Sequence, residues 1–257
     1  MYSLFVNNNT STNNGSTVTL NMNPPIHLNP EKKYYASVYE ADIVFCFPNI
    51  VTGKNDKFIF KEVVGGVLTT FTEYFDQGIY SIASIQNEIN RITQETVQNP
   101  SLFVLDADES SAHIYVHFKT TTAQIVCSGL NDVMSIIGYP NTTGILGPVT
   151  HVNDFYEGNK ATLDSVQNVY VLASFVNGGY INQQSDCILC SVTPDVVPFS
   201  TILYRVKIPM KVPVCQTLLD TITIRLVDQD MKPIIMGIIN PTDKPERWAM
   251  RIGITSE

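Results

Sequence analysis

Only a few side chains in this sequence have the type and spacing to do chemistry, and the clearest pair is Cys187 and Cys190. They stand three residues apart, as thiolates do when they bind zinc or form a redox-active disulfide. A structural zinc site needs a second pair of ligands at suitable spacing, and Cys215 stands alone. Residues i and i+3 of a strand point to opposite faces, so we expect buried strand cysteines here. The odd, scattered set indicates reduced thiols in an intracellular protein, and its members are Cys46, Cys127, Cys187, Cys190 and Cys215.

Imidazole and carboxylate groups form no catalytic or metal-binding pattern in the sequence. His113 and His117 share one face of an expected strand, but they are about 13 Å apart along it, which is too far for one metal ion. Asp106, Asp108 and Glu109 make an acidic turn without the spacing of a calcium-binding loop. The sequence has no nucleophile elbow and no glycine-rich phosphate loop. We therefore predict a protein that is not an enzyme and that holds no cofactor and no metal ion.

The charge pattern is informative about partners. Charged residues make up 16% of the 257 residues and the net charge is −8, whereas an average protein has about 25% charged residues. Residues 1–30 carry no Lys, Arg, Asp or Glu, and the densest basic pair is Lys32-Lys33. Binding to phosphates requires clustered basic side chains, so we expect no direct charge-driven contact with nucleic acid. No apolar run has the ~18 residues of a membrane span. The low charge favours permanent burial against protein partners.

Alternating apolar and polar residues predict strands from residue 17 onward. In the stretch 113–120, Ile114, Val116 and Phe118 face one way while the intervening residues face the other. Turn signals such as Gly65-Gly66 separate the strands. The expected strands are 17–22, 34–47, 58–64, 67–74, 101–106, 113–120, 168–174, 188–193, 201–208, 221–228, 233–239 and 248–254.

Two helices interrupt the strands. Apolar residues at helical spacing predict a helix over 81–97 with Ser81 as its N-cap, and a short one is expected over 130–137, ended by Gly138. A jelly roll has about eight strands, fewer than are expected here. The predicted fold is therefore all-β, a single jelly-roll β-sandwich over residues 17–257 with one or two short helices. An inserted or appended β-rich subdomain is expected within 75–150, and residues 1–16 are expected to be a flexible polar arm.

Several short motifs, in this order and spacing, resemble those of the penton (minor capsid) proteins of polinton/Maverick elements, adintoviruses, virophages and polinton-like viruses. The hairpin over 222–230, Ile-Thr-Ile-Arg-Leu-Val-Asp-Gln-Asp, is the most similar to their pattern, although Met231 and Lys232 stand where that pattern has a glycine. Further matching stretches are Asn23-Pro24-Pro25-Ile26, Lys33-Tyr34-Tyr35-Ala36-Ser37-Val38, Phe47-Pro48-Asn49-Ile50, Gly78-Ile79-Tyr80-Ser81-Ile82, Ile137-Gly138-Tyr139 and Asn168-Val169-Tyr170-Val171.

The resemblance implies a structural protein of a virion. It implies a homopentamer at the fivefold vertices of an icosahedral double-stranded DNA virus-like particle, which is assembled inside the host cell. The partners so implied are further copies of this chain, a double jelly-roll major capsid protein that surrounds the pentamer, and other minor capsid proteins.

Interface candidates follow from composition alone. The Asn/Thr/Ser-rich start of the chain fits a segment that orders against a neighbouring subunit, which makes Asn8, Asn9, Asn13 and Asn14 candidates. Trp248, the single tryptophan, is either a core residue or an interface anchor.

Two other functions stay open from the sequence. One is a jelly-roll module that binds a glycan or receptor on a virion surface, which would need aromatic and carboxylate side chains gathered on exposed loops. Tyrosines in loop-like positions keep this alternative open, and they are Tyr74, Tyr80, Tyr139, Tyr156 and Tyr180. The other is a jelly-roll enzyme, which would need a two-histidine-plus-carboxylate cluster or paired acids.

Overall fold

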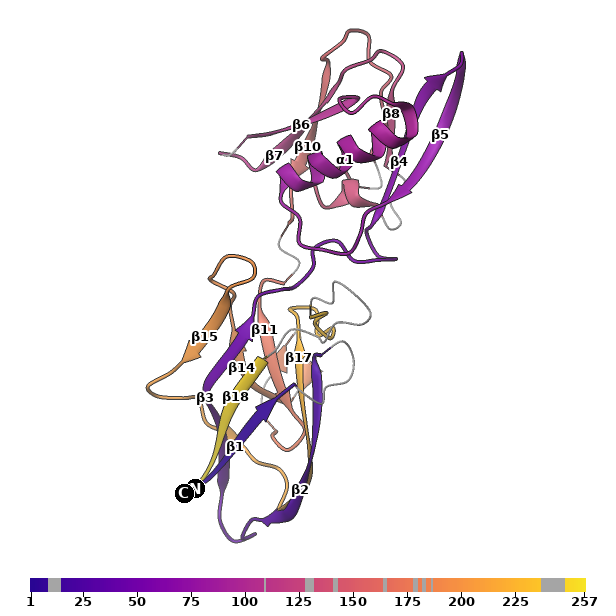
Figure 1. Cartoon of the computed structure of the whole chain (residues 1–257). Coiled ribbons are helices and arrows are strands. Elements are labelled where there is room, and N and C mark those ends of the chain that lie inside the picture. Colours follow the sequence, from indigo (N-terminus) through magenta and orange to yellow (C-terminus); the bar gives the residue numbers. More distant parts are fainter. Residues whose placement is uncertain are drawn as a thin grey trace. The chain divides into compact units, whose positions relative to one another are not determined.

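The chain consists of two compact units, and one is inserted in the sequence of the other (Figure 1). The first, the sandwich unit, comprises Met1–Phe47 and Val166–Glu257, and the second, the inserted unit, comprises Pro48–Ser165. The computed structural model describes residues 1–8, 15–108, 110–127, 132–140, 143–163, 166–177, 180–181, 184–185, 187–236 and 248–257.

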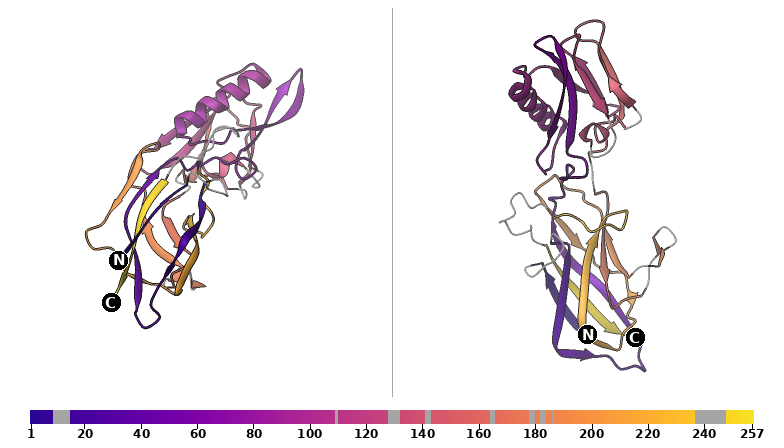
Figure 2. Two further views of the ribbon diagram at one scale, coloured as in Figure 1. Left: turned by 60° about the horizontal axis from the view of Figure 1, so that its bottom comes forward. Right: turned by 90° about the vertical axis from the view of Figure 1, so that its right-hand side faces the viewer.

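The sandwich unit contains two antiparallel sheets (Figures 1 and 2). Their strands follow the orders β1-β18-β3-β15 and β14-β11-β17-β2, and the short β16 also pairs with β3. If the eight longer strands are named B to I in chain order, the sheets read B-I-D-G and F-E-H-C, which is the jelly-roll arrangement. The predicted jelly-roll fold is confirmed. The strands of this unit are β1 (Tyr2–Asn7), β2 (Thr17–His27), β3 (Tyr34–Val44), β11 (Val169–Ala173), β12 (Tyr180–Ile181), β13 (Gln184–Ser185), β14 (Ile188–Val192), β15 (Thr201–Arg205), β16 (Val212–Pro213), β17 (Leu218–Val227) and β18 (Trp248–Ser256).

The core of the sandwich unit comes from strand alternation. Every second residue of a strand points to the same face, so the apolar members of β17 and β18 lie on one side of each strand. Ile222, Ile224, Ile252 and Ile254 are all fully buried in this way. Burial of apolar side chains of this size contributes roughly 1.5–3 kcal/mol each. Both sheets therefore contribute apolar side chains to the core, one through β17 and the other through β18.

Residues 1–16 are not a single flexible arm, and that prediction is wrong for Tyr2–Asn7. This stretch is strand β1, which pairs antiparallel with β18 over its whole length. The physical reason is that Leu4 and Val6 alternate toward the core, where they are 5% and 1% exposed. Residues 9–14 lie outside the described part of the chain.

The inserted unit joins β3 to β11 in the sequence and has its own core. It contains the sheets β5-β4-β8-β9 and β10-β7-β6 together with one long helix, and its core gathers apolar residues from all of them. The expected insertion at 75–150 falls within this unit, which begins at Pro48 and ends at Ser165. The elements are β4 (Lys57–Val64), β5 (Val67–Tyr74), α1 (Ile82–Val97), β6 (Phe103–Asp108), β7 (His113–Phe118), β8 (Gln124–Cys127), the 3₁₀ helix η1 (Val133–Ser135), β9 (Gly144–Leu146) and β10 (Phe155–Lys160).

Helix α1 forms as the sequence predicts. Ser81 is its N-cap and accepts a hydrogen bond from the Ser84 backbone N–H, while the Ser84 side chain accepts from the Ser81 N–H. This reciprocal pair satisfies two of the free donors at the helix start. Ile85, Ile89 and Ile92 line its buried face. Among the described residues, no helix is long and apolar enough to cross a bilayer.

Two expected elements differ from the prediction. In its described part, the helix expected over 130–137 is only a 3₁₀ turn at Val133–Ser135, and Asp132 caps the start of this turn by accepting a hydrogen bond from the Met134 N–H. Gly138 follows with φ +101°, the left-handed conformation expected at that position. The strand over 233–239 is reduced in its described part to one bridge between Pro233 and Val227. Pro233 has no N–H with which to extend such a ladder.

Candidate assembly interface

The outward face of the sheet β1-β18-β3-β15 carries one row of side chains that crosses all four strands. Strand register places Phe5 opposite Arg251, Arg251 opposite Glu40, and Glu40 opposite Arg205. Residues directly opposite in antiparallel strands lie side by side on one face. A shallow pocket of about 260 Å³ lies on this face, with Phe5, Glu40 and Arg251 in its lining.

The charges in this row compensate one another. Arg251 Nη2 lies 2.8 Å from Glu40 Oε1, and Arg205 Nη2 lies 2.6 Å from Asp42 Oδ1. Arg205 Nε is also 3.6 Å from Glu40 Oε2. Each side chain is 39–47% exposed, and exposed ion pairs stabilise a fold by only about 0–1 kcal/mol. Their larger effect is to leave the middle of this face without net charge, so that a neighbouring protein could cover it at low electrostatic cost.

Exposed apolar side chains flank this row at both ends of the sheet. At the β1 end they are Met1, Tyr2 and Phe5, which we call the β1 flank, and Phe5 is 74% exposed. At the opposite end, along and around β15, they are Val197, Phe199, Leu203, Ile208 and Met210, which we call the β15 flank. Ile208 is 91% exposed. Exposed apolar side chains that gather at the edges of a sheet are typical of protein interaction sites.

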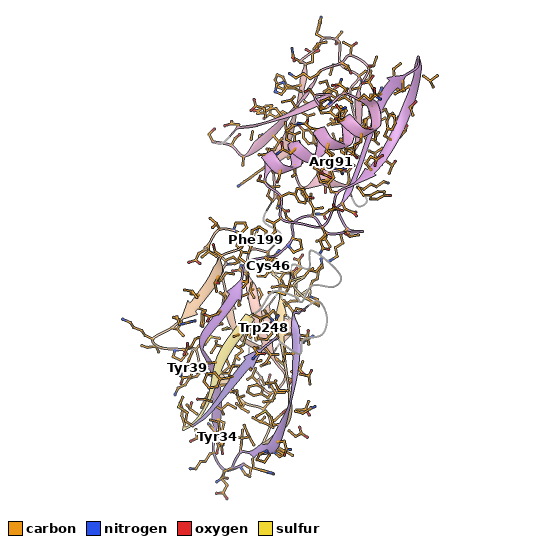
Figure 3. The ribbon with its side chains drawn as sticks, viewed as in Figure 1. Tyr34, Tyr39, Cys46, Arg91, Phe199 and Trp248 are labelled. Carbon is orange, nitrogen blue, oxygen red and sulfur yellow. The ribbon has the colours of Figure 1, made fainter. Side chains whose placement is uncertain are left out.

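The turn before β15 holds Phe199 in a conformation that such a residue rarely adopts. Its φ is +65°, in the left-handed region that side chains larger than glycine avoid. The backbone N–H of Phe199 donates to the carbonyl of Phe45 at 2.7 Å, and the N–H of Ser200 donates to that of Val197 at 3.1 Å. Phe199, labelled in Figure 3, nevertheless stays 66% exposed. Backbone strain costs about 1–3 kcal/mol and concentrates at functional positions, so this exposed aromatic ring is a strong candidate for contact with a partner.

The sequence-derived interface candidates lie elsewhere. Trp248, labelled in Figure 3, is 1% exposed, and its indole Nε1 donates a hydrogen bond of 2.7 Å to the Gly15 carbonyl. The sequence left Trp248 as either a core residue or an interface anchor, and the structure places it in the core. An interface anchor would need exposed surface, which this side chain lacks. Asn8 is 3% exposed, and its Oδ1 accepts from the Trp248 N–H at 3.1 Å. Asn9, Asn13 and Asn14 lie outside the described residues, so their contact with a neighbouring subunit stays a prediction.

The side chains considered for chemistry are dispersed. Cys190 is buried in β14, and burial raises the pKa of its thiol to about 12. Cys187 lies just before that strand and is half-buried, so it is not the buried strand residue that was expected. His113 and His117 both lie on β7, and each has a different acidic neighbour, Glu157 and Asp106. Among the described residues, no group of three or more His, Cys, Asp or Glu could hold a metal ion.

Sequence reasoning missed the β1 and β15 flanks. Alternation assigns one face of a strand to the core, but it does not distinguish an edge strand from a central one. The one available signal was the presence of large apolar residues on both sides of a proline, as in Val197-Pro198-Phe199 and Ile208-Pro209-Met210.

Comparisons with known proteins yielded structural similarity alone. No protein-family model matches the chain, and no curated protein matches it. The crystal structure of the selenomethionine-labelled mavirus penton protein is similar, with 10% sequence identity, coverage of 100% of each chain and a TM-score of 0.46.

Proposed function

We propose that this chain is a structural capsid protein, a penton subunit that forms a homopentamer at the fivefold vertices of an icosahedral double-stranded DNA virus-like particle. Its partners in the virion are further copies of itself, a double jelly-roll major capsid protein and other minor capsid proteins. It acts without catalysis and without a cofactor. The observation that carries the proposal is the presence of two different apolar flanks at opposite ends of one sheet of the jelly roll.

Two unlike surfaces on opposite edges are what a ring requires. A cyclic assembly above a dimer uses heterologous contacts, in which one patch of each copy meets a different patch of the next copy. The β1 flank and the β15 flank terminate the same sheet, at β1 and at β15. A contact between them in neighbouring copies would repeat around an axis until the ring closes.

The energetics of the flanks fit a permanent contact. Phe5, Phe199 and Ile208 are each at least 66% exposed in the single chain. Covering such side chains with a partner would stabilise the assembly by roughly 25 cal/mol for each Å² of apolar area removed from water. Obligate interfaces are large and more apolar than transient ones. The charge-compensated row between the flanks adds no net charge that would repel an identical copy.

The test is the oligomeric state of the purified full chain, measured by mass photometry and negative-stain electron microscopy. We expect five-subunit rings. Phe5→Asp and Leu203→Asp, which damage one flank each, should both give monomers because every contact in the ring uses both flanks. Val152→Asp, at a position that is 53% exposed in the inserted unit, is the matched control and should leave the rings intact. Circular dichroism would establish that all three variants fold.

Mixing the two flank variants makes the test specific for a heterologous contact. The Phe5→Asp chain keeps an intact β15 flank and the Leu203→Asp chain keeps an intact β1 flank, so one contact between them can form. The expected product is a one-to-one dimer that grows no further. A wild-type chain that stays monomeric at high micromolar concentration, or rings that survive both substitutions, would overturn the proposal.

A further inference from the structure

The inserted unit carries an aromatic and acidic surface that the capsid role does not use. It lies on the outward face of the sheet β10-β7-β6, where alternation along β7 sends Ile114, Val116 and Phe118 into the core. Tyr115 and His117, which alternate with them, therefore point away from the core.

Strand register sets the neighbours on this face. Tyr115 stands opposite Glu157 of β10 on one side and opposite Asp106 of β6 on the other. In the next row, His117 stands opposite Phe155. Tyr115 is thus the centre of a small group that spans three strands.

The aromatic members contact one another and remain accessible. The rings of Tyr115 and Phe155 meet edge to face with centroids 5.5 Å apart, and the ring of His117 lies 5.3 Å from that of Phe155. Phe155 is nevertheless 55% exposed. These contacts hold the phenyl ring of Phe155 in place, while much of the ring stays open to solvent. A ring held in this way can stack against a ligand.

Carboxylates border the rings at fixed positions. Glu157 Oε1 accepts a hydrogen bond of 3.4 Å from the Tyr115 hydroxyl and lies 2.9 Å from His113 Nδ1. Asp106 is 72% exposed and its Oδ2 lies 4.0 Å from His117 Nε2. These oxygens are acceptors for hydroxyl groups, and their negative charge repels phosphate, sulfate and carboxylate groups.

We propose that this surface, made of Tyr115, Phe155, His117, Glu157 and Asp106, binds a neutral saccharide. The apolar C–H face of a sugar ring would stack on Phe155, and its hydroxyls would donate to Glu157 and Asp106. The site lies within the inserted unit, so the inference does not depend on the assembly of the sandwich unit. Four of the tyrosines expected in loops do not form it, because Tyr139 is buried, Tyr80 and Tyr156 are half-buried, and Tyr74, at 59% exposure, lies on strand β5 of the other sheet. The side chain of the fifth, Tyr180, lies outside the described part of the chain.

The experiment uses the full chain and a panel of neutral hexose and N-acetylhexosamine oligomers, each paired with a sialylated or sulfated counterpart. Saturation-transfer NMR detects weak binding and does not require an assembled ring. We expect binding of at least one neutral oligomer and none of its anionic counterpart. Phe155→Ala should weaken that binding about tenfold through loss of the stacking surface, and Glu157→Gln should weaken it through loss of the charged acceptor.

Tyr74→Ala is the matched control, since it removes an exposed aromatic ring from a different sheet of the same unit. It should leave saccharide binding unchanged. Hydrogen exchange of β7 in each variant shows whether the sheet is intact. The inference fails if no neutral oligomer binds, if an anionic counterpart binds as well, or if Phe155→Ala with an intact sheet binds as the wild type does.

Discussion

The side-chain amide of Asn49 donates a hydrogen bond of 3.0 Å to the backbone carbonyl of Leu163, 114 residues further along the chain. These residues lie near the two ends of the inserted unit. The same amide donates to the Tyr80 carbonyl at 2.7 Å, and Asn49 Oδ1 accepts from the Tyr80 N–H at 2.8 Å. Asn49 is 6% exposed. One buried amide therefore links the beginning, the end and the helix entrance of the unit, and an insertion with adjacent ends fits between two strands of a jelly roll.

Replacement of Asn49 by Ala should lower the stability of the inserted unit by about 2 kcal/mol, because it removes three hydrogen bonds and leaves backbone groups of the half-buried Tyr80 and Leu163 unpaired. Hydrogen exchange of helix α1 reports on this unit. The single tryptophan, Trp248, belongs to the sandwich unit, and its fluorescence transition should stay in place. Asn159→Ala, at an exposed position of the same unit, is the control. Equal exchange rates in the two variants would contradict the role assigned to Asn49.

Gly138 should tolerate no side chain. A Cβ atom there would lie 2.1 Å from the Asn159 carbonyl oxygen, and φ is +101°. Gly138→Ala should therefore cost more than about 3 kcal/mol. Gly144→Ala is the matched control, since φ is +77° but nothing lies within 4 Å of its Cβ, and it should cost about 1 kcal/mol. Thermal unfolding of both variants measures the difference, and similar losses would show that backbone conformation alone matters.

The variant Phe199→Gly distinguishes the backbone strain at this position from the contact that the side chain is proposed to make with a neighbouring subunit. Glycine adopts φ +65° without steric cost, so the stability of the single chain should hold or rise by up to about 1 kcal/mol. The exposed phenyl group is lost, so the proposed pentamers should dissociate at a higher protein concentration than wild-type pentamers do. Chemical unfolding and mass photometry measure the two effects. A variant that assembles as tightly as the wild type would remove Phe199 from the β15 flank.

The five cysteines should react with an aromatic disulfide reagent in three classes. Cys215 is exposed and should react first, followed by the half-buried Cys187. Burial raises the pKa of Cys127 and Cys190 to about 12, so their thiols stay protonated near neutral pH. These two and the buried Cys46 should react only on unfolding. Rapid labelling of all five in the native chain would contradict the described packing.

Much of the secondary structure was predictable because it depends on neighbouring residues. The hairpin of β4 and β5 turns at Gly65-Gly66, where both glycines have positive φ, and the burial pattern of β7 alternates as its sequence does. The cap of α1 at Ser81 also follows from local spacing. The expected arm is the instructive failure, since a short apolar alternation at Leu4 and Val6 outweighs the polar tract that follows it.

The jelly-roll class, the helix and the low-charge surface are thus properties of the sequence itself, because each depends on residue type and period along the chain. The tertiary structure alone decided which strands end a sheet, and so which apolar residues stay exposed at the β1 and β15 flanks. It also decided that Tyr115, Phe155 and Glu157 meet on one face. Such neighbours are set by pairing between distant strands, and a local pattern carries no information about strand order.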